Sequence, residues 1–296
     1  GKVQEEFETE METNLGKMKK YAKEKEFNPG SSQQVVKVLR GVGLDTGVLT
    51  EKGEMSVKSE AIEPIIRKHV FLKHYSAWKG KQALVVNFLK NFDETADLSG
   101  MLYPSYNPAF QVTGRVSITK PPVANTPRDK RVRGSIISRF DGGKLLGVDY
   151  RQLEMRLVAS EAGDEAMLAI FKSGLDVHDE TAKVMFGKDF SKDDRDIAKN
   201  INFGTVYGIS AWSLTRKFGI PERKAEDFLA MHKGAFPAIY RWMDVQHAFI
   251  RKNGWIASRL GQVRHFPGWA QATDRERFRM MRQAGNFPIP ALGAGL

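Results

Sequence analysis

The sequence predicts an α+β fold with helices at both ends and a short β region between them. Three observations predict it. Apolar residues recur at helical spacing over residues 1–92, strand-like segments occupy residues 99–149, and helical spacing returns from Leu153 almost to the C-terminus. At 296 residues the chain has room for two domains, or for one large domain with an appendage.

The N-terminal part is expected to be a helical arm. Over residues 1–26 the apolar residues are three or four apart, and acidic residues precede lysines, as the helix dipole favours. Asn28-Pro29-Gly30 should end this helix, and Ser32 should cap a short second one. Two more helices are expected over residues 59–92.

The β region is expected to contain three short strands, at residues 102–106, 116–118 and 144–149, with an extended proline-containing loop at 121–127. The third strand ends in Asp149, after which helical spacing begins. We therefore expect a small sheet whose last strand leads directly into the helical C-terminal part.

Composition narrows the function classes. The net charge of +11 favours a polyanionic partner, with nucleic acid as the common case. The absence of cysteine excludes disulfide scaffolds, thiol catalysis and cysteine-ligated zinc. No apolar run is long enough to span a membrane, and the N-terminus has no signal-peptide pattern, so we expect no membrane partner and a cytoplasmic location.

Asp149 is the first candidate for chemistry. A carboxylate at the end of an apolar strand is held at the mouth of a sheet, where it can bind a divalent cation such as Mg²⁺. The alternative is that Asp149 only caps the following helix. Both interpretations remain open at this point.

A second candidate segment begins at Ser191, which together with Asp194 has the pattern of a capping box. The helix that follows should align Arg195, Lys199, Phe203 and Tyr207 in one slanting stripe, because they are four residues apart. The two cations could bind phosphates near the positive helix end, and the two rings could pack on a base or sugar. Alternatively, the stripe is a solvated cationic face that continues into core aromatics.

Considered together, these segments resemble the family A DNA polymerases, the group of bacterial DNA polymerase I. Residues 149–156, Asp-Tyr-Arg-Gln-Leu-Glu-Met-Arg, resemble motif A of that family, Asp-Tyr-Ser-Gln-Ile-Glu-Leu-Arg. The spacing from Arg195 through Lys199, Phe203 and Tyr207 to Gly208 resembles motif B. Further resemblances in the family's order are Phe27 to Ser31, Thr113 to Ser117, Asn125 to Arg128, Asp176 to Ala182 (Asp-Ile-His-Thr-x-Thr-Ala in the family), and Arg282 to Pro288.

The resemblance implies a role for each matching residue. Asp149 would ligate two catalytic Mg²⁺ ions, with the Tyr150 carbonyl on one of them, and Glu154 would exclude a ribose 2′-OH. The residues expected to contact the incoming dNTP or the templating position are Tyr150, Gln152, Glu154, His178, Arg195, Lys199, Phe203 and Tyr207. The residues expected to contact primer-template DNA are Arg115, Asn125, Arg128, Gly208, Arg282 and Asn286.

The resemblance also implies a right-hand polymerase architecture. Residues 1–95 would form a helical thumb and connection, 96–155 the first part of an antiparallel palm with motif A, 156–290 helical fingers with motif B, and 291–296 a tail or junction. The implied activity is template-directed transfer of dNMP to a primer 3′-OH by two-metal catalysis. The alternatives are a non-catalytic DNA-binding remnant and a single-subunit RNA polymerase, against which Glu154 argues.

The sequence also departs from the family pattern. Arg151 and Ala124 stand where the family usually has Ser and Gln, and Pro290 replaces a Gln. His178-Asp179-Glu180 spells the family's motif C, but it precedes motif B and lies in a helical context, so we interpret it as a coincidence. With motif C absent, we expect a second polypeptide to supply it, as in a split phage polymerase acting in the host cytoplasm, or a chain cut after Leu296. An unpaired sheet edge is expected as a consequence.

Overall fold

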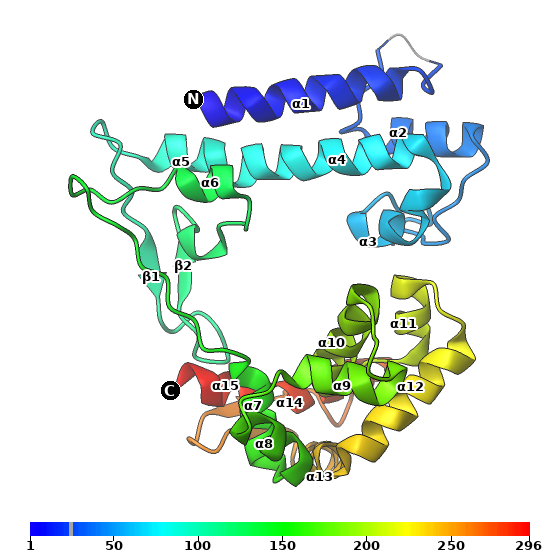
Figure 1. Ribbon diagram of the computed structural model, residues 1–296, viewed down its shortest axis with the longest axis vertical. Helices are drawn as coiled ribbons and strands as arrows, with labels where there is room; N and C mark the ends of the chain where they lie inside the picture. The colour runs from blue at the N-terminus through cyan, green and yellow to red at the C-terminus, as the bar shows by residue number, and fades with distance from the viewer. Residues whose placement is uncertain (24–25) are drawn as a thin grey trace. The chain divides into compact units, whose positions relative to one another are not determined.

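The computed structural model describes residues 1–23 and 26–296. The described chain is mostly helical, as the sequence predicts, and it divides into two compact units (Figure 1). It contains two small two-stranded sheets, of which the second, at residues 255–265, falls where the sequence predicts only helix. The first unit comprises Gly1–Tyr106 and Ile118–Gly147, and the second comprises Asn107–Ser117 and Val148–Leu296. The candidate site residues are therefore divided between two compact units.

The first unit is built on two long helical elements. The predicted first helix ends at Lys19 rather than at residue 26, and residues 24–25 of that prediction lie outside the described residues. The cap of the second helix is Ser31, not Ser32, because the Ser31 Oγ accepts from the Gln34 amide. The elements are α1 (Lys2–Lys19), α2 (Ser32–Gly41), α3 (Ser59–Ile62), η1 (Glu63–Lys68), α4 (Val70–Leu84), η2 (Val85–Leu89), α5 (Lys90–Thr95), η3 (Val123–Asn125) and α6 (Lys130–Gly134).

Helix α1 lies along α4, which continues through η2 into α5 (Figure 1). Phe7 and Met18 of α1 are fully buried, and Met18 belongs to a core with Phe71 and Leu72 of α4. Burying each such side chain contributes about 1.5–3 kcal/mol. This apolar contact is what keeps the two helices side by side.

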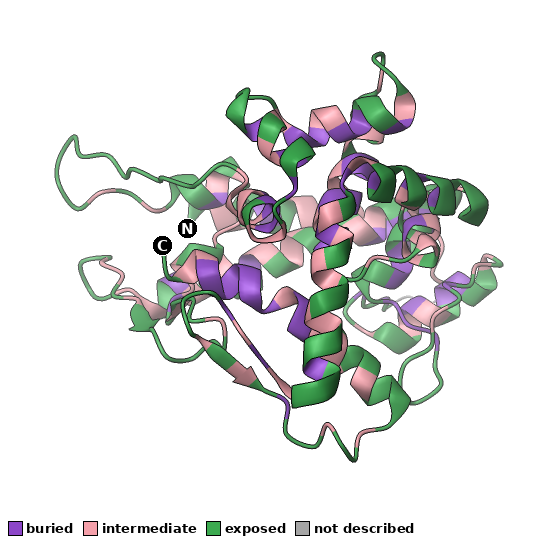
Figure 2. Ribbon diagram, turned by 90° about the horizontal axis from the view of Figure 1, so that it is seen from below, coloured by how far each residue is buried: buried purple, intermediate pink, exposed green. Residues whose placement is uncertain are grey.

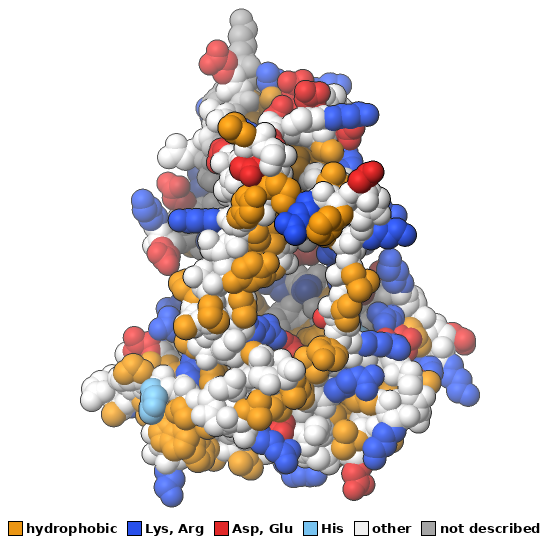
Figure 3. All heavy atoms as spheres, turned by 90° about the vertical axis from the view of Figure 1, so that its left-hand side faces the viewer, with side chains coloured by type: hydrophobic (Ala, Val, Ile, Leu, Met, Phe, Trp, Pro, Cys, Tyr) orange, Lys and Arg blue, Asp and Glu red, His pale blue; other side chains and the backbone are white. Residues whose placement is uncertain are grey.

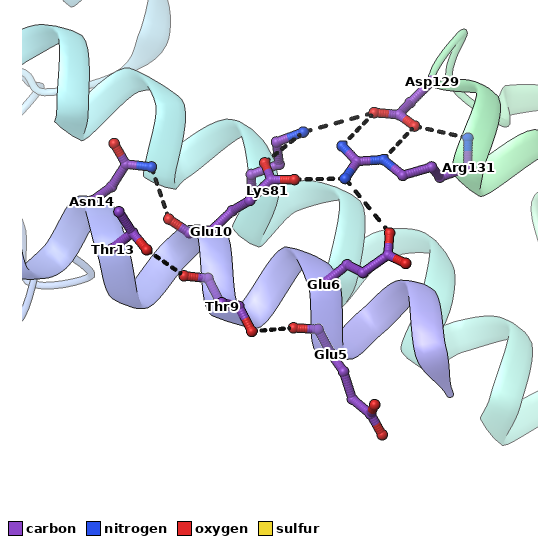
Figure 4. Close-up of polar contacts among 9 residues, drawn as sticks. All are labelled: Glu5, Glu6, Thr9, Glu10, Thr13, Asn14, Lys81, Asp129 and Arg131. Atoms are coloured by element: carbon purple, nitrogen blue, oxygen red, sulfur yellow. Dashed lines mark hydrogen bonds and ion pairs between the residues drawn. The ribbon is translucent and has the colours of Figure 1, made fainter.

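A polar cluster fastens the short helix α6 to α1 and α4 (Figure 4). Arg131 donates through Nη1 to Glu10 at 2.5 Å and pairs through Nη2 with Asp129 at 3.4 Å, while Lys81 Nζ lies 3.2 Å from Glu10. The Arg131 guanidinium also stacks on the Phe7 ring at 4.1 Å. The hydrogen bond from Arg131 holds the pKa of the Glu10 carboxyl below its usual value. The contacts of Arg131 with Glu10 and Phe7 join segments more than 100 residues apart in the sequence.

The predicted strands are found only in part. The first two appear as β1 (Ser105–Asn107) and β2 (Ser117–Thr119), which pair with each other. The third prediction, a strand at 144–149, is wrong for the described residues: this segment is extended but pairs with no other strand. Strand geometry is stabilised by a hydrogen-bonded neighbour, and the described chain provides none here.

The unpaired segment exposes apolar side chains. Leu145 and Leu146 are 63% and 89% exposed, and Tyr103 and Tyr106 are also exposed. Apolar side chains gather along the extended segments on the face drawn in Figure 3. This segment has the composition of a strand but belongs to neither sheet of the described residues, so the expected unpaired sheet edge stays a prediction.

The second unit carries the helical C-terminal part. Its elements are α7 (Leu153–Ala162), α8 (Glu165–Lys172), α9 (Val177–Phe186), α10 (Lys192–Val206), α11 (Ala211–Phe218), α12 (Glu222–Ala235), α13 (Pro237–Asn253), β3 (Trp255–Ala257), β4 (Val263–His265), α14 (Asp274–Asn286) and α15 (Pro288–Ala294). Strands β3 and β4 form an antiparallel hairpin. No helix in the described ranges is long and apolar enough to cross a membrane.

Helix α15 replaces most of the expected tail at 291–296. Its residues Ile289, Ala291 and Leu292 are buried, because α15 packs against α7 and α14. The helices of the chain carry buried residues on their packed faces and exposed residues on the others (Figure 2). The C-terminal residues therefore take part in the core that supports α7.

Candidate functional site

The entry to α7 displays the candidate metal ligand. Asp149 and Tyr150 lie on the exposed extended segment, and the helix begins only at Leu153. The N-cap residue is Gln152, in the left-handed conformation at φ 56°, so Asp149 does not cap this helix. The capping interpretation of Asp149 is therefore wrong, and its carboxylate faces solvent.

Helix α10 carries the predicted stripe. The capping box at its start is confirmed, since the Ser191 Oγ accepts from the Asp194 amide and the Asp194 carboxylate accepts from the Ser191 amide. Arg195, Lys199 and Phe203 lie within the helix, Tyr207 is its C-cap residue, and each is half-buried. These four side chains thus form a continuous face of α10, which is cationic near the start of the helix and aromatic at its end.

The cationic end of this face is unevenly neutralised. Arg195 Nη2 lies 3.2 Å from the Asp176 carboxylate, and Arg195 Nε donates to the Asp179 carboxylate. Lys199, one turn further on, has no ion-pair partner in the described part of the chain. Hydrogen bonding to Asp179, opposed by burial, raises the pKa of the Arg195 guanidinium.

Asp176 is held more firmly than its neighbours. It caps α9 by accepting from the amides of His178, at 2.8 Å, and Asp179, at 3.3 Å, and Arg151 Nη2 approaches it at 3.5 Å. Burial opposes ionisation, but these hydrogen bonds and one from Gln152 outweigh it, so the pKa of Asp176 lies below its usual value. Asp176 is therefore an anion built into the start of α9.

His178 is the centre of a buried polar network. Only 3% of its side chain is exposed; its Nδ1 accepts from Asn202 Nδ2 at 3.1 Å, and its ring lies 5.2 Å from that of Phe203. The Asn202 Oδ1 accepts from His232 Nε2 at 2.9 Å. Burial lowers the pKa of His178 to about 4, so the ring is neutral at pH 7 and carries its proton on Nε2.

Glu154 connects α7 to the end of α10. One carboxylate oxygen accepts from Arg115 and the other from the Tyr207 hydroxyl at 3.0 Å. Burial, together with the Glu154 carboxylate, raises the pKa of Tyr207 to about 12. A small pocket lies beside this pair, lined by Glu154, Met155, Val158, Phe203, Val206, Tyr207 and Ile289. The pocket places one carboxylate at the edge of an otherwise apolar and aromatic surface.

Arg282 of α14 contacts the residues at the end of α10. Its Nε donates to the Tyr207 carbonyl at 3.2 Å, and Gly208, at φ +71°, lies against its side chain, where a Cβ would come within 3.3 Å. Asn286 ends α14 with a buried Oδ1 that lacks a partner in the described residues. Asn125 and Arg128 are exposed and belong to the first unit.

The residues at the entry to α7 fit Mg²⁺ in the type of donor. The Asp149 carboxylate and the Tyr150 carbonyl are oxygen ligands, and Mg²⁺ is usually held by one or two carboxylates together with water and substrate phosphates. No group of three or more metal-ligating side chains occurs among the described residues. Asp149 is therefore suited to be one member of a ligand set that substrate and further groups complete.

Sequence reasoning missed the partners of the site residues. The pairing of Arg195 with Asp176 and Asp179 and the hydrogen bonds of Asn202 join residues 16–30 positions apart. Two signals were present: Asp176 has the spacing of a helix N-cap, and Asn202 is a polar residue at a core position between Ile201 and Thr205.

A comparison with protein families shows that residues 1–295 match the model of DNA polymerase family A. The chain is 31% identical to DNA polymerase I, thermostable, of Thermus filiformis, covering 98% of this chain and 36% of that protein. It is 28% identical to DNA polymerase I of Pseudomonas aeruginosa, over 92% of this chain and 31% of that one. The chain thus spans about a third of the curated relatives it matches.

A solved structure shares the fold. The POL domain of Pol1 from M. smegmatis, in complex with a DNA primer-template and dNTP, superposes with a TM-score of 0.86 at 24% sequence identity. The match covers 99% of this chain and 53% of that one. About half of that polymerase domain therefore has its counterpart in these 296 residues.

Proposed function

This chain belongs to DNA polymerase family A, and we propose that it forms the nucleotide-binding half of a template-directed DNA polymerase active site. One observation carries the proposal. Along α10 a cationic turn is followed by Phe203 and Tyr207. The neutral buried His178 of α9 lies 5.2 Å from the Phe203 ring, and the Glu154 carboxylate of α7 edges the aromatic pocket at the end of α10. That order matches the triphosphate, sugar and base of a nucleotide.

The cationic turn would bind the triphosphate of an incoming dNTP. Lys199 provides a charge with no ion-pair partner among the described residues, and Arg195 provides a planar fork that suits phosphate oxygens. His178 would donate from Nε2 while remaining uncharged, because Asn202 occupies Nδ1. Phosphoryl transfer depends on such positioning and charge neutralisation more than on covalent help.

The pocket would discriminate between sugars. Phe203 offers a ring against which a deoxyribose can pack, and the Glu154 carboxylate is fixed by Arg115 and Tyr207. A 2′-OH entering beside Glu154 would meet a side chain that cannot move away without losing both partners. This supports a DNA polymerase over an RNA polymerase.

Asp149 would hold Mg²⁺, with the Tyr150 carbonyl as a second oxygen donor. When bound, two such ions activate the primer 3′-OH and neutralise the phosphates of the dNTP. The chain's own contribution is an exposed carboxylate one turn before the helix that carries Glu154. The proposed metal ligand Asp149 and the proposed sugar-discriminating residue Glu154 are thus placed on either side of the start of α7.

DNA contacts would come from both units. The excess of basic residues provides the attraction to phosphates. In the second unit the candidates are Arg115, Gly208, Arg282 and Asn286, and in the first they are Asn125 and Arg128. In the family's terms, we propose that residues 1–95 act as the thumb, 96–155 as part of the palm and 156–290 as the fingers.

Primer extension tests the proposal. The 296-residue chain is incubated with primer-template, dNTPs and Mg²⁺, with and without a polypeptide that carries the family's motif C, His-Asp-Glu. We expect extension only with the second polypeptide, because two-metal catalysis needs a further carboxylate. Extension by the 296 residues alone would refute the need for that polypeptide. Duplex binding without extension in either case would indicate a DNA-binding remnant, and preference for rNTPs would indicate an RNA polymerase.

A further inference from the structure

One bidentate edge of the Arg195 guanidinium, formed by Nε and Nη2, is already engaged by carboxylates at the start of α9. Its Nε donates to Asp179, and its Nη2 contacts Asp176 at 3.2 Å. These two nitrogens form the fork with which an arginine binds an oxyanion bidentately. A triphosphate that binds through this fork must therefore displace at least one carboxylate.

The two carboxylates differ in how firmly they are held. Asp176 is fixed by two α9 amides and by Arg151, and its side chain is 18% exposed. Asp179 has only Arg195 as a hydrogen-bond or ion-pair partner in the described chain, and its side chain is 40% exposed. Asp179 is the one that can swing into solvent without unmaking a helix cap.

The charges around Arg195 set the Asp179 carboxylate and a triphosphate in competition for the same guanidinium. Arg151 and Arg195 are balanced by Asp176 and Asp179, so the cluster as a whole is neutral. Asp179 also stands where the family segment quoted above has a threonine, which cannot form an ion pair.

We propose that Asp179 is a positioning residue that holds Arg195 ready and lowers the affinity for nucleotide. In the absence of nucleotide its carboxylate occupies the Arg195 Nε, and the incoming triphosphate replaces it while Asp176 stays in place. Nucleotide binding then includes the cost of breaking one half-exposed ion pair. This inference rests on the proposed nucleotide site, because it needs Arg195 to contact the triphosphate.

Glu180 provides a matched control. It is the next residue in the first turn of α9 and carries the same charge, but it pairs with Lys183 at 2.6 Å instead of with Arg195. Neutralising either carboxylate removes the same favourable charge from the positive end of α9. Only the change at Asp179 releases Arg195.

The experiment is an equilibrium titration of the purified 296-residue chain with dATP that carries a fluorescent group on its 3′ oxygen, in Mg²⁺ at fixed salt. We expect Asp179→Asn to bind about twofold to fivefold more tightly than wild type, the range for an ion pair of this exposure. Glu180→Gln should bind like wild type and Arg195→Ala more weakly. In the Arg195→Ala background, Asp179→Asn should have no further effect.

The outcomes separate this inference from the proposed function. If Arg195→Ala weakens binding but Asp179→Asn does not tighten it, the nucleotide site stands and the role of Asp179 is refuted. If Asp179→Asn also tightens nucleotide binding in the Arg195→Ala background, the role of Asp179 is likewise refuted. If Arg195→Ala and Lys199→Ala both bind like wild type, the nucleotide site itself is wrong. Asp179→Thr replaces Asp179→Asn if the latter does not fold by circular dichroism.

Discussion

Lowering the pH from 7 to 5 should destabilise the second unit, because its helices bury two neutral histidines. Burial lowers the pKa of His178 to about 4 and that of His232 to about 3. The His232 Nδ1 faces the Tyr240 hydroxyl at 2.9 Å, and its Nε2 donates to Asn202. Among the described residues, neither buried ring has an anionic partner in direct contact to stabilise a second proton.

The sign and size of the change in unfolding free energy follow from the lowered pKa values of the two histidines. An unfolded histidine has a pKa near 6.5, so between pH 6.5 and 4 the unfolded chain binds protons that the folded chain does not. The stabilisation is complete above pH 6.5 and is lost as the pH falls. One pH unit corresponds to about 1.36 kcal/mol. At pH 5, about 1.5 units below the unfolded pKa, each histidine therefore lowers the free energy of unfolding by about 2 kcal/mol.

Urea unfolding followed by tryptophan fluorescence measures this loss. Four of the five tryptophans (Trp212, Trp242, Trp255 and Trp269) lie in the second unit, so the signal mainly reports that unit. Burial also lowers the pKa values of His74 and His247, so the total loss in wild type exceeds the contribution of the two network histidines.

The decisive comparison is between variants. His232→Gln keeps a hydrogen-bonding side chain but cannot titrate, so it should lose about 2 kcal/mol less than wild type between pH 7 and 5. The control is His265→Gln, which changes an exposed residue on β4. An equal loss in wild type and His232→Gln would refute the argument that a buried neutral His232 contributes this pH dependence.

Three further predictions concern single side chains. Arg131→Ala should destabilise the first unit by about 2 kcal/mol in thermal unfolding, because it removes the pairs with Glu10 and Asp129 and the stacking on Phe7; an unchanged melting temperature would contradict this. Glu154→Ala should raise ribonucleotide incorporation relative to dNTP roughly tenfold or more in single-turnover assays, and unchanged sugar discrimination would exclude it as the gate. Lys199→Ala should weaken every dNTP by about tenfold in the fluorescence titration, and an effect on one base only would contradict a triphosphate contact.

The helices were predictable because their signals are local. The capping box of Ser191 and Asp194 and the four-residue spacing that follows can both be recognised within 20 residues, and the structure has the helix where the sequence places it. Short-range information also predicted the strands that became β1 and β2, to within two or three residues at either end.

What the sequence could not predict depends on distant partners. Residues 144–149 have strand composition, but a strand forms only beside another, and none of the described residues pairs with them. The same holds for Arg195: its position on α10 follows from spacing, whereas its pairing with Asp179 depends on how α9 packs on α10. The burial of residues 288–292 likewise depends on α7, which is more than 120 residues away.

The central claim is that Asp149 anchors the metal-dependent chemistry of a DNA polymerase. The most direct test measures single-turnover addition of one dNMP by a polymerase domain that contains these 296 residues, comparing Asp149→Asn with Asp141→Asn, an exposed carboxylate on the same connecting segment. We predict that Asp149→Asn lowers the rate roughly a thousandfold or more, with duplex affinity within about twofold of wild type, because DNA binding depends on phosphate contacts. Asp141→Asn should leave both unchanged. Extension by Asp149→Asn at a near wild-type rate would contradict the claim.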